Sequence, residues 1–199
     1  MIIVGLTGGI GSGKTTVAKL FGNYSIPVYI ADAEAKRLMN SSEQIKQELI
    51  ELFGNNAYLN DELNKPFIAD KIFNDKAYLD NMNAIIHPKV KIHFEQWIKE
   101  QNSPYVIKEV AIIFEHQQQS KYDLIITVIA DKEKRLERVL SRDKTTPEKV
   151  FAIMSNQIDD IEKAQLSDFV ILNNDMGTLE NQIHKIHKSI LQQCRNTSN

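Results

Sequence analysis

A glycine-rich run that ends in Lys14, Thr15 and Thr16 is the segment whose residue types are best suited to do chemistry. It follows the apolar residues 2–4 and matches G-x-x-x-x-G-K-[ST] from Gly8 onward. Glycines allow successive backbone N–H groups to turn toward phosphate oxygens, and the helix that follows adds the positive end of its dipole. Lys14 can reach the β- and γ-phosphates, and the Thr15 hydroxyl can bind Mg²⁺. A glycine-rich turn that binds nothing is the alternative, but turn chemistry alone does not explain the Lys-Thr-Thr ending.

Carboxylates follow the expected strands at places where phosphoryl transfer needs them. Ligands of open α/β sheets bind at the carboxyl ends of the strands. Asp32, just past the second expected strand, could accept the proton of an attacking hydroxyl, or it could cap the helix expected from residue 33. Glu109 ends the third expected strand, where a carboxylate can order Mg²⁺ through its waters, and Glu115 follows the apolar residues 112–114. Because many surface strands end in Glu, these two acids carry little information by themselves.

The roles of several basic side chains stay open at this stage. Arg135 and Arg138 fall on the helix expected after the fourth strand, with Arg142 one turn further. They could neutralise a transferring phosphate, or they could face solvent. His184 and His187 flank the apolar stripe of the last expected helix and could hold a metal. We expect a solvated helix face instead, because no carboxylate or cysteine completes a set of ligands.

Short apolar runs alternate with helical patterns, which predicts the scaffold that must position these residues: a parallel sheet with helices on both faces. The expected strands are residues 2–6, 26–30, 105–110, 124–130 and 169–172. The helices expected beside them are residues 15–21, 132–141 and 178–192. The last helix has an amphipathic stripe of Leu179, Ile183, Ile186 and Ile190.

Two stretches are longer than ordinary connections between sheet elements. Residues 33–100 are expected to form an inserted helical subdomain, with helices at 33–39, 42–53, 66–73 and 87–100 and loops at 54–56 and 60–61. Residues 142–164 are polar and carry Arg142, Lys144, Lys149 and Lys163. In a phosphate-handling enzyme such cations suit a mobile lid that closes over the nucleotide and excludes water. The alternative is an ordinary charged helical hairpin.

Composition bounds the partners and the compartment. A chain of 199 residues can bury a substantial core, and α/β folds of this size often form one domain. With 24 basic and 26 acidic residues the formal charge is −2, so no global attraction to nucleic acid or to an anionic membrane is expected. The single cysteine, Cys194, excludes an intramolecular disulfide and a cysteine metal cluster. The chain opens directly into a strand pattern without a secretion signal, so we expect a cytoplasmic protein.

Taken in order along the chain, these residues resemble those of the dephospho-coenzyme A kinases. From Thr7 to Lys14 the loop reads Thr-Gly-Gly-Ile-Gly-Ser-Gly-Lys, which is much narrower than the generic phosphate-loop pattern. The other matching segments are Ala31-Asp32, residues 85–88 with His87-Pro88, residues 109–115, Arg135 to Arg138, Arg142-Asp143 and residues 169–174. The similarity therefore extends in the same order over nearly the whole chain, which is more specific than any single motif.

The resemblance implies an α/β P-loop kinase fold, a five-stranded parallel sheet sandwiched by helices, in a single kinase domain over residues 1–199. Residues 33–100 would be its helical acceptor-binding insertion and residues 142–164 its lid. The implied reaction transfers the γ-phosphoryl group of ATP, with Mg²⁺, to the 3′-hydroxyl of dephospho-coenzyme A. It gives coenzyme A and ADP in the final step of coenzyme A biosynthesis. The implied partners are these small molecules, without nucleic acid or membrane, and the protein would be a monomer or a small homo-oligomer.

The resemblance also assigns roles by position. Asp32 would be the base or orienting acid for the acceptor hydroxyl, Arg138 a ligand of the transferring phosphate, and Lys14 the third catalytic group. The ATP-binding residues would be Gly9, Ile10, Gly11, Ser12, Gly13, Lys14, Thr15, Thr16, Arg142 and Asn173. The acceptor would be bound by Thr7, Asp32, His87 and Glu115, and the metal by Thr15 and Glu109.

The chain departs from the family pattern at three positions. Ile30 stands for the first Asp of an Asp-Ala-Asp segment, Glu109 lengthens an Asp by one methylene, and Ala111 stands for a Pro. None of these removes a position on which phosphoryl transfer most depends, so we expect an active enzyme. A P-loop kinase of another small metabolite, such as a nucleoside monophosphate, is opposed by the long helical insertion. A GTP-type switch is opposed because the sequence lacks an Asn/Thr-Lys-x-Asp element.

Overall fold

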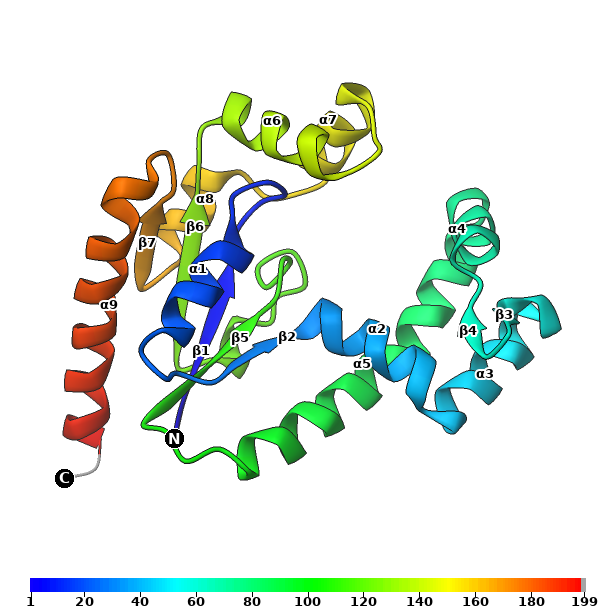
Figure 1. The fold of residues 1–199 in the computed structure, drawn as a ribbon, viewed down its shortest axis with the longest axis horizontal. Coiled ribbons are helices and arrows are strands. Elements are labelled where there is room, and N and C mark those ends of the chain that lie inside the picture. Colours follow the sequence, from blue (N-terminus) through cyan, green and yellow to red (C-terminus); the bar gives the residue numbers. More distant parts are fainter. Residues whose placement is uncertain (198–199) are drawn as a thin grey trace. The chain divides into compact units, whose positions relative to one another are not determined.

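The computed structural model describes residues 1–197 (Figure 1). The chain divides into two compact units, one formed by Met1–Tyr29 with Gln101–Asn199 and the other by Ile30–Glu100. The bounds of the second unit are close to those of the insertion expected over residues 33–100. Among the described helices, none is both long enough and apolar enough to cross a membrane.

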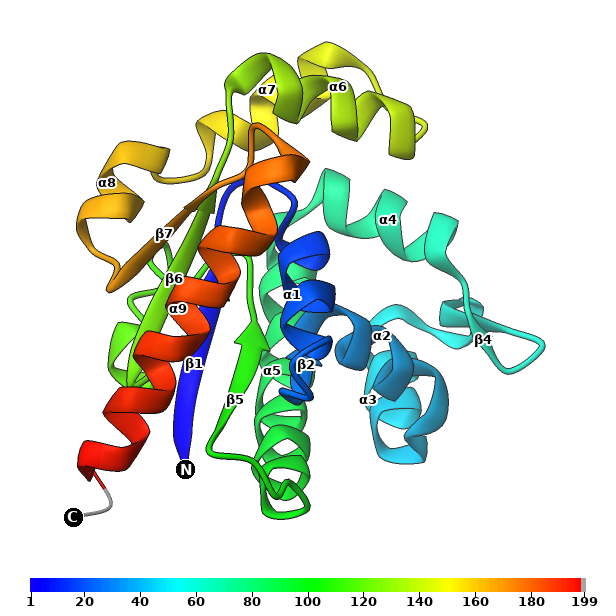
Figure 2. The ribbon, with the colours of Figure 1, turned by 60° about the vertical axis from the view of Figure 1, so that its left-hand side comes forward.

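A five-stranded sheet forms the centre of the first unit, with Ile30 at the end of β2 as its one residue from the second unit, and its strand order is β2-β5-β1-β6-β7 (Figure 2). β1 pairs in parallel with β5 and β6, and β6 pairs in parallel with β7. All strands expected from the apolar runs are present, and the prediction of an α/β fold with a parallel sheet is confirmed. The strands are β1 (Ile2–Thr7), β2 (Val28–Ile30), β5 (Tyr105–Glu109), β6 (Leu124–Ile129) and β7 (Phe169–Leu172).

Both faces of this sheet are covered, which explains why its strands are apolar along nearly their whole length. On one face, Ile126 of β6 is buried in the core that the sheet shares with α1 (Lys14–Gly22) and α9 (Met176–Thr197). On the other face, Ile125 packs with Ile113 in a second cluster. The sheet is therefore packed against apolar side chains on both sides, and the loops with the candidate site residues follow the ends of its strands.

The remaining helices of the first unit follow β6. α6 (Lys132–Arg142) begins almost directly after the strand, α7 (Pro147–Ser155) lies within residues 142–164, and α8 (Asp160–Gln165) ends one residue beyond that segment. The short 3-10 helix η2 (Gln119–Lys121), which precedes β6, is not anticipated by the sequence pattern. In α9, the expected apolar stripe is buried in the core, and it consists of Leu179, Ile183, Ile186 and Ile190.

The second unit is mainly helical, with two features that the sequence pattern does not predict. The helix expected over residues 87–100 begins at Lys76 and contains Pro88. Proline is favoured in the first turn of a helix, which makes His87-Pro88 a misleading start signal. The expected loop at 60–61 is the turn of a hairpin whose two-residue strands are too short to show alternation, and a short 3-10 helix overlaps the loop expected at 54–56. The elements are α2 (Ala31–Ser41), α3 (Glu43–Phe53), η1 (Asn55–Ala57), β3 (Tyr58–Leu59), β4 (Glu62–Leu63), α4 (Lys65–Asn74) and α5 (Lys76–Lys99).

Candidate active site

Glycines shape the loop that joins β1 to α1. Gly8, Gly11 and Gly13 have φ angles of 148°, 77° and 92°, a region that residues with side chains rarely adopt. Space is a second reason for glycine, because a Cβ at Gly13 would collide with Asn173 Nδ2, and a Cβ at Gly11 would collide with the carbonyl oxygen of Arg135. The backbone path of the loop and its close packing against α6 and the end of β7 therefore both require glycine.

The Lys14 ammonium folds back onto this loop. Its Nζ donates to the carbonyl oxygens of Gly8 at 2.9 Å and Gly9 at 3.2 Å. α1 begins at Lys14, so the N–H groups of its first turn and the positive end of its dipole face the loop. Thr15 is exposed and Thr16 is half-buried in the same turn. A glycine loop, an ammonium and a helix N-terminus thus lie together, an arrangement suited to a chain of phosphates.

Two oxygen donors near this loop suit a divalent cation. Glu109 ends β5, is 5% exposed and pairs in register with Leu6 of the neighbouring β1, while Thr15 lies in the first turn of α1. Mg²⁺ prefers oxygen ligands and usually keeps waters and phosphate oxygens, so few protein ligands suffice. Within residues 1–197, no group of three or more His, Cys, Asp or Glu side chains could hold a metal by itself. The donor set therefore fits a magnesium ion that binds together with a nucleotide.

Arg138 and Asn173 also contact the backbone of this loop. Arg138 Nη2 donates to the Asn173 carbonyl oxygen at 2.8 Å, and its Nη1 lies 3.4 Å from the carbonyl oxygens of Gly11 and Ser12. Asn173 Nδ2 donates to the Ser12 carbonyl oxygen at 2.8 Å. In the described part of the chain, Ser12 Oγ and Asn173 Oδ1 are buried without a hydrogen-bond partner. Buried polar atoms of this kind are costly, so they mark places where a bound ligand can supply the missing partner.

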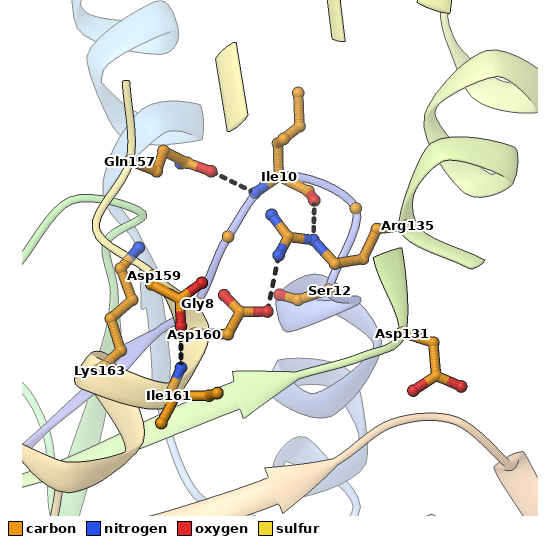
Figure 3. A network of polar contacts seen from close by, with 12 residues as sticks. Gly8, Ile10, Ser12, Asp131, Arg135, Gln157, Asp159, Asp160, Ile161 and Lys163 are labelled. Carbon is orange, nitrogen blue, oxygen red and sulfur yellow. Dashed lines mark hydrogen bonds and ion pairs between the residues drawn. The ribbon is translucent and has the colours of Figure 1, made fainter. Parts of the chain in front are cut away.

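Arg135 does not face solvent, so that alternative is wrong for this residue. It is 8% exposed, its Nε donates to the Ile10 carbonyl oxygen at 2.9 Å, and its Nη1 lies 2.6 Å from Asp160 Oδ2 (Figure 3). Burial raises the pKa of the Asp160 carboxyl, although the positive charges of Arg135 and Lys163 oppose this rise. Sequence reasoning missed the contact because Arg135 and Asp160 belong to different helices, and neither position shows which residue it meets.

Two residues assigned to the acceptor have partners within the first unit. Thr7 is fully buried, and its Oγ1 donates to the Ala111 carbonyl oxygen at 3.1 Å. Glu115 Oε1 accepts from the Ile158 N–H at 3.2 Å and forms an ion pair with Lys163 Nζ at 2.6 Å. Lys163 is fully buried, so the expectation that it belongs to a set of lid cations facing the nucleotide is wrong. This ion pair instead fixes α8 to the segment after β5.

The segment 142–164 combines an exposed cation with a lined cavity. The Arg142 side chain is 64% exposed and lies 2.8 Å from Asp143 in an ion pair. A cavity of ≈ 620 Å³ lies beside α6 and α7. Its lining joins the residue after β6, both helices and the segment that leads into the first residue of α8. It consists of Ala130, Lys132, Arg135, Phe151, Met154, Ser155, Gln157, Ile158, Asp159 and Asp160.

Asp32 and His87 both belong to the second unit. Asp32 is exposed and lies in the first turn of α2, whose N-cap is Ile30, so the alternative that Asp32 caps this helix is wrong. An acid in the first turn is favoured by the helix dipole but leaves its carboxylate accessible. His87 is exposed on α5, directly before Pro88.

His184 and His187 do not lie on a solvated face of α9. Both are half-buried, and their Nδ1 atoms lie 3.3 Å from the Tyr24 hydroxyl and 2.7 Å from the Tyr105 hydroxyl, respectively. Burial, with the charge of His184, lowers the pKa of His187. The expectation of a solvated face is wrong because tyrosines from α1's C-terminal side and from β5 reach α9 at these two positions.

Comparison with known proteins gives consistent results over nearly the whole chain. A family model described as dephospho-CoA kinase matches residues 2–180. A relative from Bacteroides fragilis named dephospho-CoA kinase is 37% identical over 183 residues, which are 92% of this chain and 89% of the relative. The solved structure of TT1252 from Thermus thermophilus is 31% identical, with a TM-score of 0.82 and coverage of 96% of this chain and 97% of that one. Dephospho-CoA kinase from Campylobacter jejuni shares the fold, at 22% identity, a TM-score of 0.69 and coverage of 94% and 96%.

Proposed function

The chain belongs to the dephospho-coenzyme A kinase family, and we propose how its own residues transfer the γ-phosphoryl group of ATP to the 3′-hydroxyl of dephospho-coenzyme A. The products are ADP and coenzyme A. The observation that carries the proposal is the loop between β1 and α1, where positive-φ glycines and the Lys14 ammonium surround one short stretch of backbone. Phosphoryl transfer asks the protein mainly for positioning and charge neutralisation, and such a loop supplies both.

The nucleotide phosphates bind to the loop backbone and to Lys14. On binding, the ammonium exchanges its bonds to the Gly8 and Gly9 carbonyls for bonds to phosphate oxygens, and it neutralises charge that develops on the transferred group. Ser12 Oγ and Asn173 Oδ1, which are buried without a hydrogen-bond partner, support this assignment because a ligand on the loop can form hydrogen bonds with them. The other ATP-binding residues are Gly9 to Gly13, Thr15, Thr16 and Arg142.

Thr15 and Glu109 are the residues that would hold Mg²⁺ with the nucleotide. When bound, the ion neutralises phosphate charge and orients the terminal phosphate. The burial of Glu109 at the edge where β1 and β5 end supports this role, since a carboxylate with little access to water gains from a cation beside it.

Asp32 accepts the proton of the attacking hydroxyl or orients it. Its exposed carboxylate, not used as a helix cap, supports this role. Thr7, Asp32, His87 and Glu115 are the proposed residues of the acceptor site, and residues 33–100 are the proposed acceptor-binding insertion. Because the Glu115 and Thr7 side chains are already bonded within the protein, they act by shaping the site.

Arg138 stabilises the charge of the transferring phosphate, and residues 142–164 form a lid. The half-buried Arg138 guanidinium already lies at the Gly11 and Ser12 carbonyls, close to where phosphates bind. We further propose a cytoplasmic protein that acts as a monomer or small homo-oligomer and needs no nucleic acid or membrane. The near-neutral composition supports the last point.

A coupled assay of ADP release, run with and without dephospho-coenzyme A, tests the proposal. We expect ADP release from ATP and Mg²⁺ that depends on dephospho-coenzyme A, and no comparable release with nucleoside monophosphates. Faster turnover of a nucleoside monophosphate would contradict the acceptor assignment. Release that ignores every acceptor would contradict the kinase assignment itself.

A further inference from the structure

Ile10, at the tip of the phosphate loop, is held at both of its backbone groups by side chains from distant parts of the first unit (Figure 3). Arg135 Nε donates to the Ile10 carbonyl oxygen at 2.9 Å, and the Ile10 N–H donates to Gln157 Oε1 at 2.8 Å. Asp160 Oδ2 in turn accepts from Arg135 Nη1 at 2.6 Å. We call Arg135, Gln157 and Asp160 the loop clamp. Its members come from α6, from the residues after α7 and from the start of α8.

The loop clamp is a buried, closely packed arrangement. Arg135 is 8% exposed, and the Asp160 side chain is 17% exposed. The guanidinium also lies close to Gly9, where a Cβ would collide with Nη2. Burying an arginine is costly unless its charge is paired and its donors are used, and here Asp160 meets the first need and the Ile10 carbonyl the second. The position of the guanidinium is therefore fixed from both sides.

The loop needs such external support because of its own composition. Gly8, Gly11 and Gly13 allow the positive-φ path, but glycine also has the largest conformational freedom of any residue. If ATP had to order this backbone when it bound, the lost entropy would be subtracted from its affinity. Contacts at both backbone groups of Ile10 order the tip before the ligand arrives.

We propose that Arg135, Gln157 and Asp160 are positioning residues, which set the affinity for ATP by holding residues 9–11 of the loop in the phosphate-binding conformation. They act through Ile10 and Gly9 and touch no substrate atom. This inference rests on the proposed function only in that ATP binds at this loop.

A positioning role predicts a specific kinetic signature. The loop holds the phosphates in the ground state and in the transition state alike. Loss of the loop clamp therefore weakens the binding of ATP and the binding of the transition state by a similar factor. KM for ATP then rises while kcat changes little, and KM for dephospho-coenzyme A stays as it was. A purely structural role would instead lower the melting temperature and the fraction of active protein, and leave KM for ATP unchanged.

The test variants separate loop positioning from stability. Arg135→Met alone would leave the half-buried Asp160 carboxylate without its cation, so the main variant is Arg135→Met/Asp160→Leu, which removes both charges. Gln157→Met removes the second contact to Ile10 independently. The matched control, Arg195→Met, makes the same arginine replacement at an exposed position on α9.

Calorimetric titration with ATP and Mg²⁺, without acceptor, gives Kd, and ADP release gives KM and kcat. From the loss of hydrogen bonds of ordinary strength we expect Kd to rise about tenfold in Arg135→Met/Asp160→Leu and about threefold in Gln157→Met. We expect kcat within about twofold of wild type in both, and all parameters within about twofold in Arg195→Met. If the double variant does not fold, Arg135→Lys, which keeps a cation for Asp160 but loses the planar fork, should raise Kd in the same direction.

Two results would overturn the inference. One is an unchanged Kd for ATP in Gln157→Met and in the folded arginine variant. The other is a fall in kcat at unchanged KM, which would mean that Arg135 contacts the transferring phosphate directly. Failure of the proposed function is a separate outcome, since a wild-type protein that ignores dephospho-coenzyme A would still give the ATP Kd values that decide the role of the loop clamp.

Discussion

Breaking the ion pair between Lys163 and Glu115 should lower the thermal stability of the protein strongly. Lys163 is fully buried, the Glu115 side chain is 11% exposed, and Nζ lies 2.6 Å from Oε1. Glu115 Oε1 also accepts from the Ile158 N–H at 3.2 Å. This hydrogen bond holds the carboxylate in its buried position and opposes a rotation that would expose it to solvent. Lys163→Met keeps the apolar stem of the side chain but leaves this carboxylate buried without its cation.

The size of the effect follows from burial. Removing one partner of a buried ion pair costs about 3–5 kcal/mol of unfolding free energy. In a protein of this length each kcal/mol lowers Tm by about 2–4 °C, so Tm should fall by about 6–20 °C. The exposed pair of Lys91 and Glu95 is a matched control, with a distance of 3.7 Å and side chains 67% and 55% exposed. Lys91→Met should cost less than about 0.5 kcal/mol.

Differential scanning calorimetry of these variants decides the matter. Glu115→Leu/Lys163→Met leaves no unpaired charge, so it should recover most of the stability that Lys163→Met loses. A Tm of Lys163→Met within about 2 °C of wild type would refute the burial argument, because that change corresponds to less than about 1 kcal/mol. Equal losses in the single and double variants would show that packing, and not the orphaned carboxylate, dominates.

The remaining predictions concern the reaction and its pH range. Asp32→Asn should lower kcat while the Kd of ATP from calorimetry stays near wild type, because the amide cannot take a proton. Lost ATP binding with normal turnover would instead assign Asp32 to the ATP site. Glu109→Gln should raise the Mg²⁺ concentration needed for half-maximal activity, and an unchanged magnesium titration would remove Glu109 from the metal site. Burial, with the charge of His184, lowers the pKa of His187 in the folded protein. The His187 imidazole therefore binds a proton more readily in the unfolded chain than in the folded protein. Stability should therefore fall as pH drops below about 6.5, and urea unfolding of His187→Asn should show a weaker fall than wild type.

Much of the scaffold could be predicted because its signals are local. Each strand of the central sheet is an apolar run that both faces of the sheet bury, so β1 and β6 were visible as hydrophobic segments. The phosphate loop is predictable for a similar reason. Its backbone path requires glycine at Gly11 and Gly13, so the glycines of the sequence pattern indicate the loop directly. The start of α5 was missed because Pro88, a residue that usually marks a first turn, lies in its interior.

The polar contacts around the loop could not be predicted, because each depends on where two distant segments meet. Arg135 and Lys163 look like ordinary helix-surface cations in the sequence, yet each is buried against one carboxylate from another segment. His187 looks solvent-facing by periodicity, but Tyr105 reaches it from the sheet. Helical periodicity shows which side of a helix is apolar. It does not show which neighbour covers a polar residue at the border of that side.

The central claim is that Lys14 and its loop transfer the γ-phosphoryl group of ATP to the 3′-hydroxyl of dephospho-coenzyme A. Mass spectrometry and phosphorus NMR of the product, from wild type and from Lys14→Ala at equal protein concentration, test it most directly. We predict that wild type forms coenzyme A phosphorylated at the 3′ position, and that Lys14→Ala, folded with a wild-type Tm, forms it at least about 100-fold more slowly. A product phosphorylated elsewhere, or a rate for Lys14→Ala within a few fold of wild type, would contradict the claim.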